Sequence, residues 1–560
     1  MGLIFATRMK TIKAAISLFL MVGFLVPGMA FGQNGTPERD EVYAKIRKEG
    51  TDNSKVMNTI HYFTDLYGPR LTGSPNYNNA AKWGTEEMKR WGFDNTFLEP
   101  WEFGRPGWVN ERNTGMIISP MQDTLTYEVL AWSPSTKGVV TGDAFLLVIP
   151  QFPAAENPRV MQNPTQAELT AYLEGVKAAV NGKIVLVGRH TFIDQSTPQS
   201  PKRLNDDVVK CRADVTKTPQ ECAALAGIPA GPQGPPQQRV TPREGALNGA
   251  QLAEQLNKFL VDNNVLVRIN ESQLDRGLVR AFNNNTFDVT KVVPTVVMRN
   301  EDFGRITRLL ANKTPVKLEF DIRNRTIPET QSYNMIGEIA GSDKKDEVIM
   351  LGGHLDSWHS ATGATDNAVG CATMMEAARI IKAIGVKPRR TIRVACWSGE
   401  EQGLLGSQAY VKKHFGSFEA PTAEYNKFGG YFNIDSGTGK ARILSVFGPP
   451  ETAAVLREAL APFSDFGFGG VVPTSGRGLG GTDSTSFNNA GLPGIGSQQD
   501  PIEYFAGTWH TNIDTYERII EDDVKKSAII FAAAVYTLAM RDELLPRFAA
   551  DKMPKPPTAN

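Results

Sequence analysis

Residues 348–357 read VIMLGGHLDS, and this stretch governs how the rest of the chain is interpreted. The apolar run 348–352 predicts a strand that is buried on both faces. His354 and Asp356 follow where this strand ends, and residues two apart in an extended segment point the same way. Because ligands of open α/β sheets bind at the carboxyl ends of strands, the stretch predicts a polar site at a sheet edge.

The same arrangement recurs downstream of residue 330. Further strands are predicted at 391–397, 429–434 and 443–447, and helices at 371–384, 451–461 and 522–541. Strands that alternate with helices indicate a mixed, mostly parallel sheet sandwiched by helices. Upstream, helices are predicted at 40–49 and 80–91, followed by short β-like runs at 144–148, 183–187, 293–298 and 316–320. The predicted fold class is therefore α/β with a β-rich insert.

Carboxylates also follow the other predicted strands. Glu400 and Glu401 come after 391–397, Asp435 after 429–434, Asp366 stands before the helix 371–384, and His510 lies near the end of the chain. Zinc accepts histidine nitrogen and carboxylate oxygen, and one Asp can bridge two ions. Adjacent glutamates in an extended turn point apart, so one can bind metal while the other acts as a general base.

Each of these patterns has an ordinary interpretation when it is taken alone. An HxD pair or a Glu-Glu turn is usually a surface feature, and Asp435 alone could be a helix cap. Their joint placement after successive strands favours a metal site. The remaining histidines have no such context and are interpreted as structural or surface residues: His61, His190, His359 and His414.

The order HxD, Asp-Asn before a helix, Glu-Glu-x-Gly, Asn-x-Asp-Ser and His-Thr-x-x-Asp-Thr resembles the co-catalytic zinc exopeptidases. This family includes bacterial leucyl aminopeptidases and plasma glutamate carboxypeptidase, and the resemblance spans about residues 330–545. Residues 68–74 and 101–108 are similar to the family's N-terminal part. Residues 125–325, notably 181–187, are similar to its protease-associated insert.

The resemblance implies a site with two Zn²⁺ ions. One ion would be held by His354, Asp366 and Asp435, and the other by Asp366, Glu401 and His510. Glu400 would be the general base and Asp356 the carboxylate that orients His354. The family often has a cis peptide bond after Asp366. This sequence departs from many aminopeptidases at Trp509, where they have a tyrosine that could stabilise an oxyanion; Tyr504 is a candidate substitute.

The sequence leaves open which terminus of the substrate is cleaved. Aminopeptidases hold the substrate amine with a carboxylate, and carboxypeptidases hold a carboxylate with Arg or Lys. The candidate substrate-binding residues are Arg477, Asp483, Glu503 and Tyr504. An aminopeptidase acting on short peptides is favoured, with a carboxypeptidase or dipeptidase of the plasma glutamate carboxypeptidase type as the alternative. A non-catalytic protein of the transferrin-receptor type is disfavoured because every ligand is present, and no G-x-S-x-G or HExxH motif supports another hydrolase class.

Composition and the N-terminus bear on location and partners. The 560 residues are 41% hydrophobic and carry 60 basic and 60 acidic residues, so nothing favours a nucleic-acid partner. Arg8, Lys10 and Lys13 before the apolar run 14–26 predict a signal peptide at 1–32 and a secreted or periplasmic protein without stable membrane insertion. The sequence leaves the oligomeric state open, a homodimer included.

The sequence also divides the chain into parts. The expected parts are the signal peptide (1–32), an N-terminal part of the catalytic domain (33–124), the insert (125–325), the zinc peptidase domain (326–545) and a flexible tail (546–560). Residues 227–238 are rich in Pro and Gly and are expected to form an exposed loop. Cys211 and Cys222 could pair after export, whereas Cys371 and Cys396 lie in apolar segments and are expected to be buried thiols.

Overall fold

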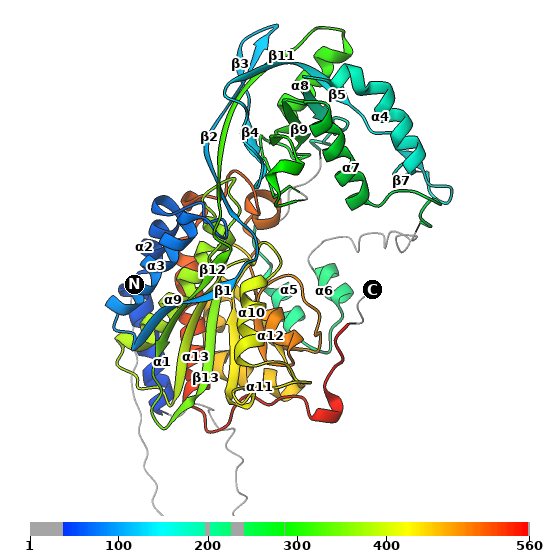
Figure 1. Cartoon of the computed structure of the whole chain (residues 1–560). Helices are drawn as coiled ribbons and strands as arrows, with labels where there is room; N and C mark the ends of the chain where they lie inside the picture. Colours follow the sequence, from blue (N-terminus) through cyan, green and yellow to red (C-terminus); the bar gives the residue numbers. More distant parts are fainter. Residues whose placement is uncertain (1–36, 159, 197–201, 226–239, 285, 558–560) are drawn as a thin grey trace, which may run out of the picture.

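The structure is a computed structural model that describes residues 37–557 except 159, 197–201, 226–239 and 285 (Figure 1). The predicted signal peptide and the Pro/Gly-rich stretch 227–238 lie outside the described residues. Within the described ranges, no helix has both the length and the apolar character needed to cross a membrane.

One eight-stranded sheet carries the predicted alternation of strands and helices. Its strand order is β1-β12-β14-β13-β15-β18-β16-β17, and β13 runs parallel to both β14 and β15. Antiparallel pairs join β1 to β12, β12 to β14 and β16 to β18, which makes the sheet mixed as predicted. The bounds are β1 Asn95–Glu102, β12 Gln331–Ile339, β13 Lys344–His354, β14 Arg390–Trp397, β15 Phe428–Asn433, β16 Ala441–Phe447, β17 Gly470–Thr474 and β18 Gly494–Gln499.

Helices cover both faces of this sheet. Successive strand residues point to opposite faces, so Ile349 and Leu351 of β13 join one apolar cluster while Val348 and Met350 join another. The first cluster also contains side chains of α1 (Pro37–Asp52), α3 (Pro75–Arg90), α9 (Val369–Ala383), α11 (Pro450–Leu460) and α13 (Glu521–Met540). The second contains side chains of α10 (Leu405–His414) and α12 (Ser484–Asn489). The sheet is therefore buried on both sides, as its apolar strands require.

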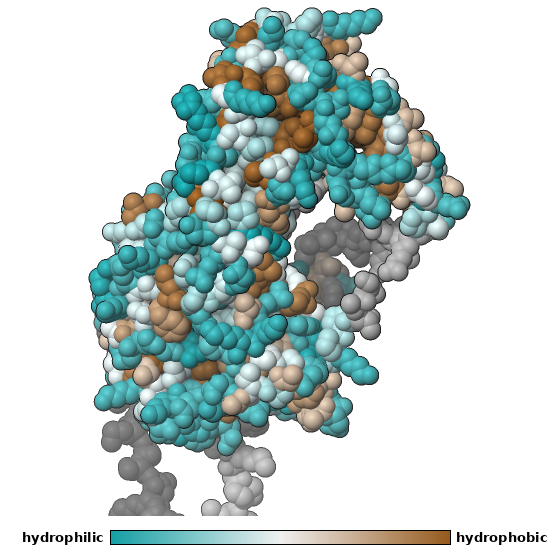
Figure 2. All heavy atoms as spheres, viewed as in Figure 1, coloured by the Kyte–Doolittle hydropathy of each residue, from teal (hydrophilic) through white to brown (hydrophobic). Residues whose placement is uncertain are grey.

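The insert carries most of a second eight-stranded sheet, which stands above the first unit in Figure 1. Its order is β3-β2-β11-β5-β8-β9-β10-β4, and the helices α4 (Gln166–Val180), α7 (Gly249–Asp262) and α8 (Asn300–Ala311) accompany it. The bounds are β2 Gly107–Ser119, β3 Asp123–Thr124, β4 Tyr127–Val129, β5 Val140–Leu147, β8 Ile184–Val187, β9 Val267–Glu271, β10 Thr295–Met298 and β11 Lys317–Ile327. Two strands of this sheet, β2 and β3, precede residue 125 and lie in the part of the chain that the sequence assigned to the catalytic domain. In Figure 2 the apolar side chains of the visible face gather mainly over the upper part of this insert.

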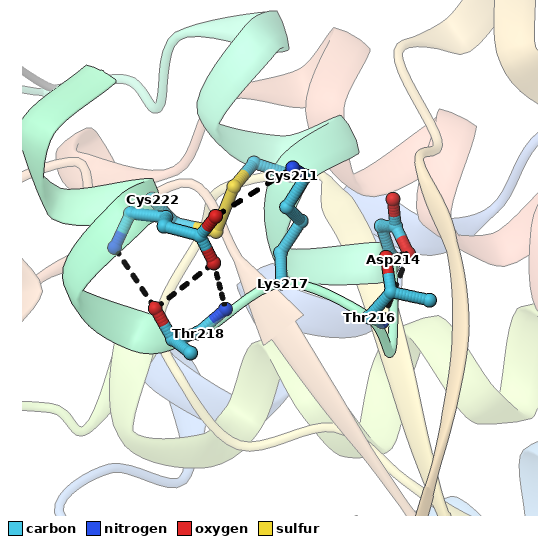
Figure 3. Close-up of a disulfide and its surroundings, with 7 residues drawn as sticks. Cys211, Asp214, Thr216, Lys217, Thr218 and Cys222 are labelled. Atoms are coloured by element: carbon cyan, nitrogen blue, oxygen red, sulfur yellow. Dashed lines mark hydrogen bonds and ion pairs between the residues drawn. A yellow bond between two sulfur atoms is a disulfide. The ribbon is translucent and has the colours of Figure 1, made fainter.

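One excursion of the insert packs on the first unit instead of on its own sheet. It contains α5 (Asp206–Ala213), which contacts β16 and β17, and α6 (Pro219–Leu225), and Figure 1 shows their place beside the first unit. Arg203 anchors the excursion, because its Nη1 is 3.0 Å from Asp500 Oδ2 and 2.8 Å from Asp523 Oδ2. A disulfide joins Cys211 of α5 to Cys222 of α6, which confirms the expected pairing (Figure 3). Cys371 and Cys396 are free and buried, also as expected.

Candidate metal centre

The first sheet brings all five predicted metal ligands together at the carboxyl ends of its strands. His354 ends β13, Glu401 follows β14 and Asp435 follows β15. Asp366 lies in the turn Ala364–Ala368, which leads into α9 and contains the expected cis peptide bond between Asp366 and Asn367. His510 is in the left-handed region with φ 59°.

Asp366 lies between the two histidines. Its Oδ1 is 3.2 Å from His354 Nε2, and its Oδ2 is 3.1 Å from His510 Nε2. His354 Nε2 is also 3.4 Å from Asp435 Oδ1, and His510 Nε2 is 2.9 Å from Glu401 Oε2. Each histidine therefore has its own terminal carboxylate and shares Asp366, which is the arrangement expected for a bridging ligand.

The donor atoms suit divalent metal. Those of His354, Asp366 and Glu401 lie within 4.8 Å of one another, and so do those of His354, Glu400 and Asp435. Asp366 Oδ2, Glu401 Oε1 and Asp435 Oδ1 are buried and have no hydrogen-bond partner. Buried carboxylates without hydrogen bonds are costly unless a cation balances them. Nitrogen and carboxylate donors in this number fit zinc.

The pKa values of the clustered side chains are shifted because charged groups lie close together in a buried site. Burial raises the pKa of Glu401 to about 7, with Asp366 adding to the shift and His510 opposing it. Burial alone would lower the pKa of His510, but Glu401 and Asp366 outweigh it and raise that pKa to about 10. Burial also raises the pKa of Glu400 well above its ordinary value. The cluster therefore holds more negative charge than its two histidines balance.

Asp356 supports the turn that carries the two glutamates. Its carboxylate accepts hydrogen bonds from the backbone N–H of Glu400 and of Glu401, both at 3.3 Å, and from Thr72 Oγ1 at 2.9 Å. His354 Nδ1 is 2.9 Å from the backbone carbonyl of Asp356 and 3.5 Å from its carboxylate. The carbonyl is thus the nearer partner of the His354 ring, and the carboxylate mainly fixes the Glu400–Glu401 turn.

Two further supporting residues were missed by the sequence analysis. Arg70 is fully buried and donates to the carbonyls of Leu355, Thr362 and Gly363, which lie between His354 and Asp366. Asp514 accepts from the backbone N–H of Thr365 at 2.6 Å and of Asp366 at 3.0 Å. Both residues lie in segments that the sequence analysis singled out, Arg70 in the loop 68–74 and Asp514 in the motif that contains His510. Neither residue, however, has a local sequence pattern that indicates its supporting role.

The insert also reaches the site. The ring of Phe282 lies edge-on to that of His510, with centroids 5.1 Å apart, and Trp509 stacks on His510 at 4.0 Å. Arg280 lies over the Trp509 ring at 4.8 Å and donates to the Trp509 carbonyl at 3.3 Å. His510 Nδ1 has no hydrogen-bond partner, so these aromatic contacts and those of Nε2 with Asp366 and Glu401 orient the ring.

Arg477 does not serve the predicted substrate-binding role in this structure. It is buried, and its five N–H donors are all used: two on Glu419, two on Asn489 O and one on Pro554 O. A guanidinium with no donor left cannot bind a substrate carboxylate. The sequence placed Arg477 near the pocket because it precedes Asp483, but the fold directs it toward the C-terminal tail.

Of the other candidate substrate residues, Asp483 and Tyr504 lie near the cluster. Asp483 is fully buried with neither carboxylate oxygen hydrogen-bonded, and burial raises its pKa to about 7. Glu503 is partly exposed and lies 3.3 Å from Lys202 Nζ. Tyr504 is buried, and burial with the charges of Asp366 and Asp435 raises its pKa well above the ordinary value, so its hydroxyl keeps its proton.

The other histidines lie outside the cluster, as expected. His61 Nδ1 is 2.6 Å from Asp65 on an exposed helix, and His414 Nε2 is 2.7 Å from Glu99. His359 contacts the carbonyl of Val129 in the insert.

Comparison with known proteins identifies the segment that holds the metal centre. Residues 334–535 match the model of peptidase family M28. This segment belongs to peptidase family M28. Carboxypeptidase Q of Mus musculus is 30% identical over 46% of this chain and 52% of that protein. Aminopeptidase YwaD of Bacillus subtilis is 26% identical over 47% of this chain and 54% of its own length.

The chain thus spans about half the length of these curated relatives. A solved structure of an M28 peptidase precursor from Shewanella amazonensis covers more of the fold. It matches 91% of this chain and 99% of its own with a TM-score of 0.60 at 22% identity. That similarity extends the shared fold beyond the M28 segment.

Proposed function

We propose that the protein is an exported zinc exopeptidase that hydrolyses terminal peptide bonds of short peptides. The observation that carries this proposal is the paired set of donors around Asp366, with one histidine and one terminal carboxylate on each side. Membership of the segment in an M28 family whose named relatives are peptidases supports it.

His354, Asp366 and Asp435 would hold one zinc ion, and Asp366, Glu401 and His510 a second. Zinc supplies Lewis acidity at the scissile carbonyl and at the attacking water. Glu400 remains as the carboxylate outside these two sets, 3.9 Å from His354 Nε2. We assign it the proton transfer: its carboxylate takes a proton from water as the C–O bond forms and returns it to the leaving amine as the C–N bond breaks.

Tyr504 is the candidate donor to the oxyanion. Its raised pKa keeps the phenol protonated next to Asp366 and Asp435, and a buried hydroxyl aimed at developing negative charge stabilises it. This assignment would explain why Trp509 can occupy the position at which many aminopeptidases have tyrosine.

We favour cleavage at the amino end. Asp483 is a buried carboxyl without a hydrogen bond, and its pKa is affected by His354 and Asp435, so it lies near the cluster and could meet an ammonium group. Cleavage at the carboxyl end is the second candidate. Arg280 favours it, because its bonds to the carbonyls of Trp509 and Phe505 are long, at 3.3 and 3.5 Å, and could be exchanged for a substrate carboxylate.

A dipeptide panel under identical zinc concentration tests these assignments. The N-acetylated and C-amidated forms of one Leu-Ala substrate should be compared with the free form. Loss on acetylation alone supports an aminopeptidase, and loss on amidation alone, together with loss in Arg280→Ala, supports a carboxypeptidase. Rapid cleavage inside a peptide blocked at both ends would refute exopeptidase action.

Glu400→Gln separates the chemistry from metal binding. The variant should keep its zinc content and lose about 10²–10⁴-fold in kcat, because it removes the proton acceptor only. Near-normal turnover would exclude Glu400 as the base. Metal analysis of the wild-type protein should give two zinc ions per chain, and one ion would contradict the paired assignment.

Export and the protease-associated character of the insert (125–325) belong to the same proposal. The Cys211–Cys222 disulfide supports export, since disulfides persist in oxidising compartments. N-terminal sequencing of the mature protein from a secreting host should begin close to residue 33. A mature chain that retains residues 1–32 would exclude signal cleavage.

A further inference from the structure

A second cavity lies where the insert meets the first unit. Its volume is about 250 Å³, a little below the roughly 300–1,000 Å³ of sites for drug-sized ligands, so it suits a smaller molecule. The chain segment 358–361 separates it from the metal centre, because Trp358, Ser360 and Ala361 face the metal ligands while His359 lines the cavity. The polar lining residues that matter here are Asn76, Asn110, Glu128 and His359.

Glu128 is the charged group of this cavity. It is the middle residue of β4, and its neighbours Tyr127 and Val129 pack in the core of the insert, so Glu128 projects from the opposite face. In the part of the chain that the structure describes, no side chain or backbone group forms a hydrogen bond or ion pair with its carboxyl group, and no Lys or Arg lines the cavity. Burial raises the pKa of Glu128 to about 8. A carboxyl group thus faces the cavity without a counter-charge.

The other polar groups of the lining present acceptors. His359 Nε2 is 2.5 Å from the Val129 carbonyl and therefore carries the proton, which leaves Nδ1 as a buried acceptor without a partner. Burial lowers the pKa of His359 to about 4, so the ring is neutral at pH 7.

The two asparagines continue this pattern. Asn110 Nδ2 donates to Asn324 Oδ1 at 2.7 Å and to Arg112 O at 3.2 Å, and Asn76 Nδ2 lies 3.5 Å from Gly68 O. Both N–H groups of Asn110 and one of Asn76 are thus directed at the protein, and the two amide oxygens remain as acceptors. A cavity lined mainly by acceptors and by a buried carboxyl group without a cation beside it is complementary to a ligand that brings donors and a positive charge.

We propose that this cavity binds a small organic cation, a primary ammonium on a short apolar stem, with the ammonium against Glu128. An ammonium has three N–H donors and no acceptor, which matches the lining. Pro69, Leu71 and Val109 supply apolar wall for the stem. A metal ion fits this cavity less well. Within the described residues, clusters of three or more His, Cys, Asp or Glu that could hold a metal ion occur only at the metal centre. This inference does not depend on the proposed peptidase activity.

Calorimetric titration of the full-length, metal-containing protein with n-butylammonium tests the site. Wild type should bind it saturably, and Glu128→Gln should bind it at least about tenfold more weakly, because a charge-assisted hydrogen bond is lost. Glu111→Gln is the matched control: Glu111 is on β2, is about half exposed and pairs with Arg325 instead of facing the cavity. The control should bind like wild type, and butan-1-ol should not compete.

The same titration identifies the source of the ammonium. A blocked peptide that contains lysine and competes with n-butylammonium assigns the site to a lysine side chain, and failure to compete assigns it to free amines. If n-butylammonium bound at the metal centre instead, Glu128→Gln would not change its affinity. Equal affinity of wild type and Glu128→Gln therefore overturns the proposal, and so does a wild type that does not bind n-butylammonium. If Glu128→Gln does not fold, wild-type crystals soaked in n-butylammonium decide the matter. Density beside the Glu128 carboxylate supports the site, and its absence refutes it.

Discussion

Replacement of Arg70 by Lys should destabilise the protein strongly although the charge is kept. The guanidinium is fully buried, and its Nε donates to Leu355 O at 2.6 Å. Its Nη1 donates to Phe63 O at 2.8 Å and Thr362 O at 2.7 Å, and its Nη2 to Gly363 O at 2.8 Å. Three of these four bonds join the loop 68–74 to the segment between His354 and Asp366, and the fourth holds the loop to Phe63.

The magnitude follows from the acceptors that lysine cannot reach. An ammonium is a compact point donor and cannot reproduce the planar fork of a guanidinium. If two of the four buried carbonyls lose their partner at about 1–3 kcal/mol each, the free energy of unfolding falls by about 2–6 kcal/mol. For a large domain, about 2 °C per kcal/mol then gives a drop in Tm of about 4–12 °C.

Differential scanning fluorimetry on purified protein measures this drop, and zinc analysis accompanies it. Arg112→Lys is the matched control, because Arg112 has an exposed fraction of 54% and its Nε is 2.9 Å from Asp321. That variant should stay within about 0.5 kcal/mol of wild type, as exposed substitutions do. An Arg70→Lys protein that melts within about 1 °C of wild type, with full zinc content, would show that these hydrogen bonds do not hold the ligand loop.

Three further predictions address charge, metal and redox state. Glu419 pairs with buried Arg477, and this partner lowers the pKa of Glu419 from 4.5 to about 2. The stabilisation that the pair gives the folded state is therefore complete above pH 4.5 and is lost as the pH falls toward 2. Glu419→Gln should therefore lower the urea midpoint at pH 7, with the difference from wild type shrinking toward pH 2; a constant difference would contradict this. Asp366→Asn should reduce the zinc content at both positions, because one oxygen of the Asp366 carboxylate faces each histidine. The exposed control Asp52→Asn should keep its full zinc content, and loss of only one ion from Asp366→Asn would argue against a bridging role. Thiol titration of the denatured, unreduced protein should find two thiols, Cys371 and Cys396, and four after reduction; four before reduction would exclude the disulfide.

The strands that carry ligands could be predicted because their local pattern is strong. In β13 and β14 every position from Val348 to Leu351 and from Val394 to Trp397 is buried, so the sequence shows continuous apolar runs that end in polar residues. β12 was not predicted, because its sequence mixes buried polar and apolar residues. Ser332 and Asn334 are buried there only since they meet Ser398 Oγ at 3.1 Å and Gly406 O at 3.0 Å. Those partners are distant in the chain, so no local sequence pattern indicates these contacts.

The ligands differ from their supporting residues in the same way. His354, Asp366, Glu401, Asp435 and His510 lie in short motifs whose order is informative. Arg70 acts on residues 285–293 positions away, and an arginine in a loop of Gly and Pro ordinarily indicates a solvated side chain. Arg477 illustrates the converse error, since proximity to Asp483 in sequence did not place its guanidinium near the cluster.

The site therefore rests on two kinds of support. His354 and Asp435 stand at the ends of central strands, whereas Tyr504 and His510 stand on one loop that the body of the insert touches at one end and its excursion at the other. Val279 N–H donates to Asn512 Oδ1 at 2.9 Å, and Asn512 N–H donates to Val279 O at 3.0 Å. At the other end of the loop, Ile502 N–H donates to Lys202 O at 2.9 Å. A shift of the insert would move this loop while the strand ends stay fixed. Of the two proposed zinc positions, the one that uses His510 therefore depends on where the insert sits.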